Sequence, residues 1–166
     1  MSLISNNLAV LPIVVSLSTG VLTFLFRRYT NLRNAVSLIG GASVLGATLW
    51  IAAEARNTVL IYRLGGDLVS DNIPFGILLE IDQLSAFMMA FAAFVMLVSL
   101  VYSVSYISDR GQLVSYHTLW HFLGAGVMGA FSTGDLFNLF VWFEVLLMSS
   151  YILAAFYSNQ EATRST

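Results

Sequence analysis

Long apolar runs, separated by short clusters of charged and polar residues, dominate the pattern along this chain. Because the hydrocarbon core of a bilayer is about 30 Å thick, a helix needs roughly 20 predominantly apolar residues to cross it. The runs predict an all-α integral membrane protein of about five transmembrane helices, in a single membrane domain that covers residues 1–166. The predicted helices cover residues 8–26, 35–53, 84–107, 113–131 and 136–157.

The segment between the second and third runs carries strand and turn patterns. Residues 58–62 have strand composition, Gly65-Gly66 is typical of a turn, and residues 74–79 form a second apolar stretch. We expect a β-hairpin that lies on the outer membrane surface between helices two and three. The alternative is an irregular loop.

The basic residues divide unevenly between the two sides of the predicted bundle. Cytoplasmic loops of membrane proteins carry an excess of Lys and Arg. We therefore expect a multi-pass protein of the cell membrane, with the N-terminus outside and the C-terminus in the cytoplasm. Residues 1–10 lack the basic start of a signal peptide, so the first run is expected to be retained. Arg27, Arg28, Arg33, Arg110 and Arg164 fall on the expected cytoplasmic side, and Arg56 and Arg63 on the other.

The composition of the chain excludes several classes of function. Of the 166 residues, 58% are hydrophobic and 10% are charged, whereas a soluble domain carries about a quarter charged residues. A net charge of −2 provides no basic patch, so nucleic acid is not an expected partner. The absence of cysteine excludes disulfides, thiol redox chemistry and Cys-ligated metal. No cofactor is expected, and no nucleophile–base or metal constellation indicates an enzyme with its own active site.

Glu144 is the strongest candidate for chemistry. It follows Asp135 by nine residues in the fifth run, which places it ~13 Å into the membrane, near the centre of the hydrocarbon core. An ionised carboxylate there costs at least ~2.5 kcal/mol. The carboxyl group is therefore either neutral much of the time or faces a polar partner or water, and both suit a proton-exchanging residue. The alternative is a protonated glutamic acid that donates an interhelical hydrogen bond.

The helical wheel gives Glu144 mostly apolar neighbours. Asp135 lies on the opposite side, so within the helix only Tyr151, two turns away, is a polar neighbour. Tyr151 is itself expected to be an interior packing or hydrogen-bonding residue. The residues that share the face of Glu144 are Phe137, Phe140, Val141, Leu147, Met148 and Tyr151.

His117 and His121, four residues apart in the fourth run, share one helix face. The spacing suits two metal ligands, but no further ligand is evident, so no metal is expected. Haem is disfavoured because the other runs contain no histidine. His121 and Glu144 lie on adjacent antiparallel helices at depths that differ by only ~5 Å. His121 is therefore the candidate partner of Glu144 in a proton or ion pathway; the alternative is a histidine satisfied by interhelical hydrogen bonds.

Small residues four apart predict close packing between helices. The pairs with this spacing are Ala42 with Gly46, Ala125 with Gly129, and Gly126 with Ala130.

The region around Glu144 also resembles a known family. Residues 134–147, GDLFNLFVWFEVLL, are similar to the fifth-helix signature of the antiporter-like membrane subunits shared by complex I and the Mrp-type multisubunit sodium/proton antiporters. The resemblance is greatest to the N-terminal part of the D-type Mrp subunit and runs over essentially the whole chain. Further matching segments are YRLGG at 62–66, PFGI at 74–77, LSA at 84–86 and GVMGAF at 126–131.

This resemblance implies a fold of about fourteen helices and a role in moving protons or sodium. The family's helix-five glutamate maps onto Glu144 and is thought to work with lysines on later helices. This sequence ends after the fifth run and contains no lysine, so it does not complete a glutamate–lysine pair. Three forms are consistent with that ending: the N-terminal part of a split subunit, a truncated or frameshifted product, or a short accessory form without transport of its own.

We therefore expect a component of a multisubunit monovalent cation (sodium)/proton antiporter, in which Glu144 contributes a mid-membrane carboxylate to the ion or proton pathway. The expected partners are other membrane subunits of the complex, the lipid bilayer, protons and sodium. One alternative is a proton-translocating subunit of a complex I-like or membrane-bound hydrogenase assembly. Another is a structural assembly subunit that does not transport.

Overall fold

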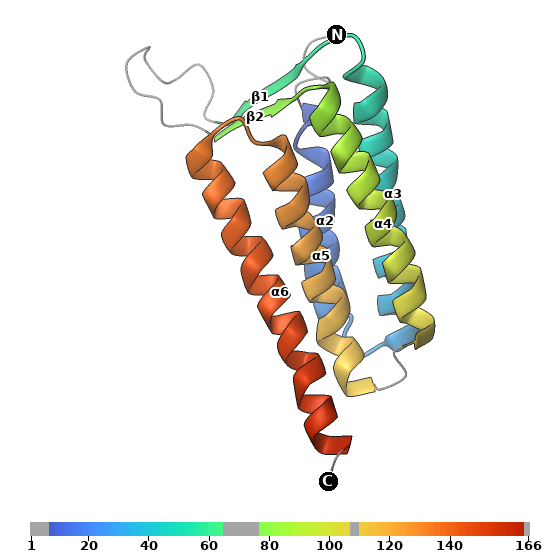
Figure 1. Cartoon of the computed structure of the whole chain (residues 1–166). Coiled ribbons are helices and arrows are strands. Elements are labelled where there is room, and N and C mark those ends of the chain that lie inside the picture. The colour runs from blue at the N-terminus through green and yellow to red at the C-terminus, as the bar shows by residue number, and fades with distance from the viewer. Residues whose placement is uncertain (1–6, 65–76, 107–109, 165–166) are drawn as a thin grey trace.

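The chain folds into a helical bundle with a small sheet across one end (Figure 1). The computed structural model describes residues 7–64, 77–106 and 110–164. Within these ranges it contains five helices and one antiparallel pair of strands, which confirms the predicted helices and hairpin. The helices are α2 (Leu11–Leu25), α3 (Thr30–Glu54), α4 (Gln83–Tyr106), α5 (Arg110–Ser132) and α6 (Leu136–Arg164), and the strands are β1 (Leu60–Leu64) and β2 (Ile77–Ile81).

Three of the described helices are long and apolar enough to cross a membrane, by length and composition. They are α3, residues 83–105 of α4, and residues 136–155 of α6. The helix α2 is shorter, with 15 residues, and carries Pro12 in its first turn, where the missing N–H costs no helical hydrogen bond. Both α3 and α6 extend beyond the predicted 35–53 and 136–157, because apolar content does not mark the polar turns at helix ends.

Arg33 was expected in the connection between the first two helices, and that placement is wrong. It lies in the first turn of α3 and is only 1% exposed. Its Nε and Nη2 atoms donate to Asn34 Oδ1, over 3.3 and 3.1 Å. A long basic side chain can bury its stem against apolar neighbours, so an arginine does not always mark a loop.

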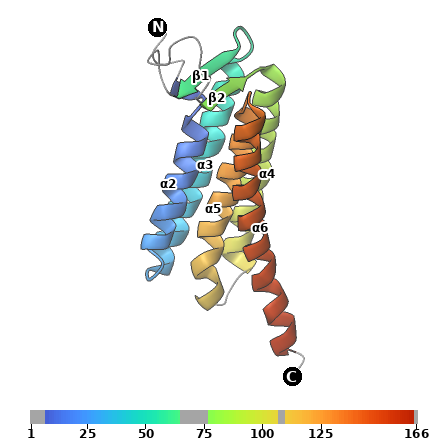
Figure 2. The same cartoon turned by 90° about the vertical axis from the view of Figure 1, so that its left-hand side faces the viewer.

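The helix α5 is central to the bundle, and α6 packs mainly against it, at one edge (Figures 1 and 2). Two glycines of α5 allow this approach. A Cβ atom added to Gly129 would overlap the indole of Trp142, and one added to Gly126 would lie 3.0 Å from the backbone nitrogen of Leu146. One glycine of each predicted pair of α5 therefore contacts a neighbouring helix, as predicted.

The close approach of α2 to α3 lies at Gly40 rather than at the predicted pair Ala42 and Gly46. A Cβ atom on Gly40 would overlap the side chain of Thr19, whereas one on Gly46 would meet nothing within 4 Å. Ala42 and Gly46 are both exposed, so this pair faces outward in the described structure.

The two strands lie across the end of the bundle where α3 ends and α4 begins (Figure 1). Leu60 pairs with Ile81, and Leu64 with Ile77. Leu60 and Ile81 are 4% and 0% exposed, so the hairpin packs its apolar side onto the helices. The predicted turn at Gly65-Gly66 lies outside the described residues.

The hairpin also holds the turn that leads into α6. Leu79 forms a bridge to Thr133, and the Gly134 amide donates to the Leu78 carbonyl over 3.1 Å. After β2, Asp82 accepts a hydrogen bond from the Ser85 amide over 2.7 Å. That bond holds the pKa of Asp82 below its ordinary value and stabilises the first turn of α4.

Candidate functional site

Glu144 lies near the middle of the part of α6 that is long and apolar enough to cross a membrane. The start of this helix is fixed by Asp135, whose Oδ1 accepts the Phe137 amide over 3.1 Å. Asn138 Nδ2 donates to Thr133 Oγ1 over 2.9 Å and ties the first turn to the preceding bend. The cap therefore determines where Glu144 lies along α6, nine residues further on.

The rotation of α6 about its axis is determined by its contact with α5. Trp142 and Leu146 face the glycines of α5, and Asn138 and Ser149, on the same stripe, are 3% and 5% exposed. Glu144 is two residues from both Trp142 and Leu146, so it points roughly 160° away from each. Its side chain is accordingly exposed.

The whole face around Glu144 is apolar and uncovered. Among the described residues Glu144 forms no ion pair or hydrogen bond. Its six predicted neighbours are all exposed, from 41% to 76%. The face is made up of Phe137, Phe140, Val141, Leu147, Met148 and Tyr151.

The two histidines are buried on a different side of α5. His117 and His121 are 0% and 3% exposed. Ser37 of α3 lies between them, with its Oγ 3.0 Å from His117 Nδ1 and 3.0 Å from His121 Nε2. The structure therefore does not bring His121 and Glu144 together: the histidine faces α3, while the carboxylate faces away from α5.

Further hydroxyl groups line the interface between α2 and α5. Ser16 Oγ donates to the His121 carbonyl over 3.0 Å, and the hydroxyls of Thr23 and Thr118 lie 3.2 Å apart. Sequence inspection missed Ser16 and Ser37. The pattern that could have indicated them is the recurrence of small polar residues at helical spacing, which form buried stripes on both α2 and α3.

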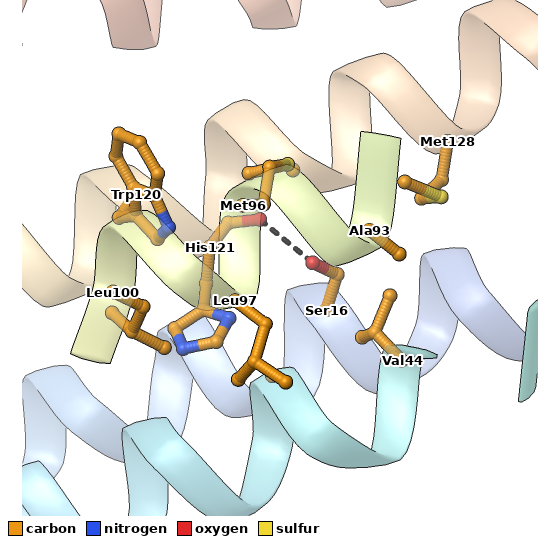
Figure 3. A pocket seen from close by; sticks show the side chains of 11 residues that line it. Ser16, Val44, Ala93, Met96, Leu97, Leu100, Trp120, His121 and Met128 are labelled. Atoms are coloured by element: carbon orange, nitrogen blue, oxygen red, sulfur yellow. Dashed lines mark hydrogen bonds between the residues drawn. The ribbon is translucent and has the colours of Figure 1, made fainter. Parts of the chain in front are cut away.

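A small cavity lies beside these residues, between α2, α3, α4 and α5 (Figure 3). Its volume is about 20 Å³. Ser16 and His121 contribute to its wall together with Trp120, and the other lining residues are apolar side chains and glycines. No group of three or more His, Cys, Asp or Glu side chains that suits a metal ion occurs in the part of the chain that the structure describes.

The fold is shared with a component of a known membrane complex. A chain in the structure of the membrane-bound sulfane sulfur reductase, an archaeal respiratory membrane complex, matches with a TM-score of 0.70 and 21% sequence identity. The match covers 86% of this chain and 22% of the other. No protein-family model matches the chain. The fold and the apolar helices indicate a multi-pass membrane protein.

Sequence comparison identifies relatives of this chain. The chain is 36% identical over 149 residues to the D-type subunit of the Na⁺/H⁺ antiporter of Alkalihalophilus pseudofirmus. It is 31% identical over 149 residues to the equivalent protein of Bacillus subtilis, and 36% identical over 153 residues to the D-type subunit of a probable K⁺/H⁺ antiporter of Rhizobium meliloti. The chain is therefore a homologue of the D-type antiporter subunits, and the resemblance recognised in the sequence is confirmed.

These matches cover most of this chain but only part of each relative. They include 89%, 89% and 88% of the chain, and 29%, 29% and 27% of the three relatives. The chain thus spans less than a third of the length of these proteins.

Proposed function

We propose that the chain is a component of a multisubunit monovalent cation/proton antiporter, to which it contributes Glu144 as a mid-membrane carboxylate of the ion or proton pathway. The observation that carries this proposal is the position of Glu144 at the centre of an exposed, apolar face of α6. The homology to Na⁺/H⁺ and K⁺/H⁺ antiporter subunits supports it.

A carboxylate on such a face requires a partner. Lipid would surround it with hydrocarbon, which costs at least ~2.5 kcal/mol for the ionised form. Intramembrane carboxylates usually face a bundle interior or a water-filled cavity. We infer that further helices of the same complex cover this face of α6 and supply polar groups or water to Glu144.

Everted membrane vesicles test this function. The complete complex is produced with and without this chain, in cells that lack other antiporters, and a pH gradient is imposed. We expect added Na⁺ or K⁺ to dissipate the gradient only when the chain is present. Cation-dependent dissipation that persists in full without the chain would contradict the proposal and leave only a structural role in assembly.

The shared fold with a respiratory membrane complex favours a second candidate, a proton-translocating subunit of a redox-driven assembly. The same vesicles distinguish the two functions. In the redox-driven case, proton movement follows the addition of an electron donor and does not respond to Na⁺ or K⁺.

The orientation of the chain is open to a direct test, because the sequence contains no cysteine. Asn31 and Asn57 are both exposed, at opposite ends of α3. If the N-terminus is outside, a membrane-impermeant maleimide should label Asn57→Cys in intact cells and Asn31→Cys only after permeabilisation. The opposite pattern would reverse the proposed topology.

A further inference from the structure

A buried hydrogen-bonded chain joins α3 and α5 on a side of the bundle remote from the exposed face of α6. It consists of His117, Ser37 and His121, which we call the His–Ser–His chain. The serine oxygen lies 3.0 Å from one nitrogen of each ring. The three side chains are 0%, 0% and 3% exposed, so bulk water does not compete for these hydrogen bonds.

The single hydroxyl restricts where the protons of the two rings are placed. A serine hydroxyl donates one hydrogen bond, and a neutral imidazole has one N–H and one acceptor nitrogen. If Ser37 donates to one ring, it must accept from the other. The facing atoms are Nδ1 of His117 and Nε2 of His121, so both rings then have the same tautomer, either both Nε2–H or both Nδ1–H.

The geometry points to a proton relay formed by His117, Ser37 and His121, which is separate from Glu144 and passes protons along the interface of α3 and α5. A proton that binds Nδ1 of His121 makes that ring cationic. Its Nε2 proton then moves to Ser37 Oγ as the hydroxyl proton moves to His117 Nδ1. The positive charge has now moved to His117, which becomes neutral when it releases its Nε2 proton.

This step conserves protons and charge and requires no other reactant. It converts the pair from two Nε2–H tautomers to two Nδ1–H tautomers, and transfer in the opposite direction restores them. The two histidines are one helical turn apart, so the relay advances the proton by ~6 Å along α5.

Each end of the His–Ser–His chain has a feature that suits proton entry or release. His121 lines the cavity of about 20 Å³ that Ser16 also borders (Figure 3), and this exceeds the ~10–15 Å³ that one water molecule requires. At the other end, His117 Nε2 is buried and has no hydrogen-bond partner among the described residues.

Nitrogen-15 NMR tests the arrangement without any transport measurement. The chain contains only two histidines, so [¹⁵N]histidine labelling of the full chain in lipid nanodiscs gives two sets of ring signals, which a His117→Gln variant assigns. We expect matched tautomers in the unsubstituted chain, and loss of the match in Ser37→Ala. An unmatched pair in the unsubstituted chain would overturn the relay, because Ser37 would then not link a donor to an acceptor.

Transport by the complete complex provides the second measurement, and only this part rests on the proposed function. A positioned proton-transfer group is typically worth 10²–10⁴-fold in rate, so Ser37→Ala should slow cation-driven proton transport about 100-fold. Ser37→Thr keeps the hydroxyl and should restore most of the rate. Ser43→Ala is the matched control, since Ser43 is exposed on the same helix and, among the described residues, its hydroxyl bonds only to the Ile39 carbonyl.

The two proposals can fail independently. Equal rates for Ser37→Ala and Ser43→Ala, in complexes of equal yield, would overturn the relay and leave the role of Glu144 intact. Full transport by a Glu144→Gln complex would overturn the role of Glu144. Matched histidine tautomers and a slow Ser37→Ala complex would still support the relay in that case.

Discussion

Replacement of Glu144 by glutamine is expected to reduce cation-driven proton transport by the complete complex to background, a loss of about 10²–10⁴-fold. Glutamine keeps the size and hydrogen-bonding capacity of the side chain but does not bind or release a proton. Glu144 is exposed on α6 and forms no hydrogen bond or ion pair among the described residues, so the variant should assemble normally. Everted vesicles that contain the variant complex provide the rate, and co-purification of the other subunits provides the assembly control.

Glu54→Gln is the matched control for this substitution. Glu54 is also exposed, but it ends α3, whereas Glu144 lies near the middle of a candidate membrane span. Both variants replace one carboxyl group by an amide of the same size, so only the position differs. We expect Glu54→Gln to transport within about twofold of the unsubstituted complex. Equal rates for the two variants would show that Glu144 is dispensable and remove the main support for the proposed function.

The position of Glu144 along α6 was predictable because it depends on local sequence. The Ser-Thr-Gly-Asp turn ends α5, Asp135 caps α6, and a rise of 1.5 Å per residue gives the rest. The hairpin was predictable for the same reason, since strand and turn composition are local properties. Both features follow from residues that are close together in the chain.

The partner of His121 was not predictable in the same way. Similar depth on adjacent helices suggested Glu144, but a contact also requires the correct rotation of both helices. That rotation depends on Gly126 and Gly129, which allow Trp142 to pack closely on α5 and direct Glu144 outward. The sequence shows small residues at the right spacing, yet it does not show which neighbour fills the space beside them.

Ser37 illustrates a related difficulty. Ser and Thr are frequent in these helices, and many bond only to a carbonyl of their own helix, as Ser43 and Thr48 do. Ser37 differs only because α3 turns it towards α5, where both histidines lie. Arg33, one turn earlier, shares this buried, polar stripe, although its charge favours a position outside the helix.

Replacement of Gly129 by leucine is expected to detach α6 from α5 and to destabilise the chain by about 3 kcal/mol. A Cβ atom at this position would overlap the Trp142 indole, and overpacking of a close contact typically costs about 1–3 kcal/mol. Because α6 packs mainly on α5, few other contacts compensate. Titration of the full chain with SDS in mixed micelles, followed by circular dichroism and tryptophan fluorescence, measures the change in stability.

Gly46→Leu is the control for the intrinsic effect of the substitution in a helix. A side chain at Gly46 meets nothing within 4 Å, so this variant should unfold within about 0.5 kcal/mol of the unsubstituted chain. Trp142→Ala should in turn make room for the leucine, so that the double variant loses less stability than the two single changes predict together. Simple additivity, or an equal loss in Gly46→Leu, would show that the contact of Gly129 with Trp142 does not hold α6 in place. The outward position of Glu144 would then require support from helices outside this bundle, since its rotation follows from that contact.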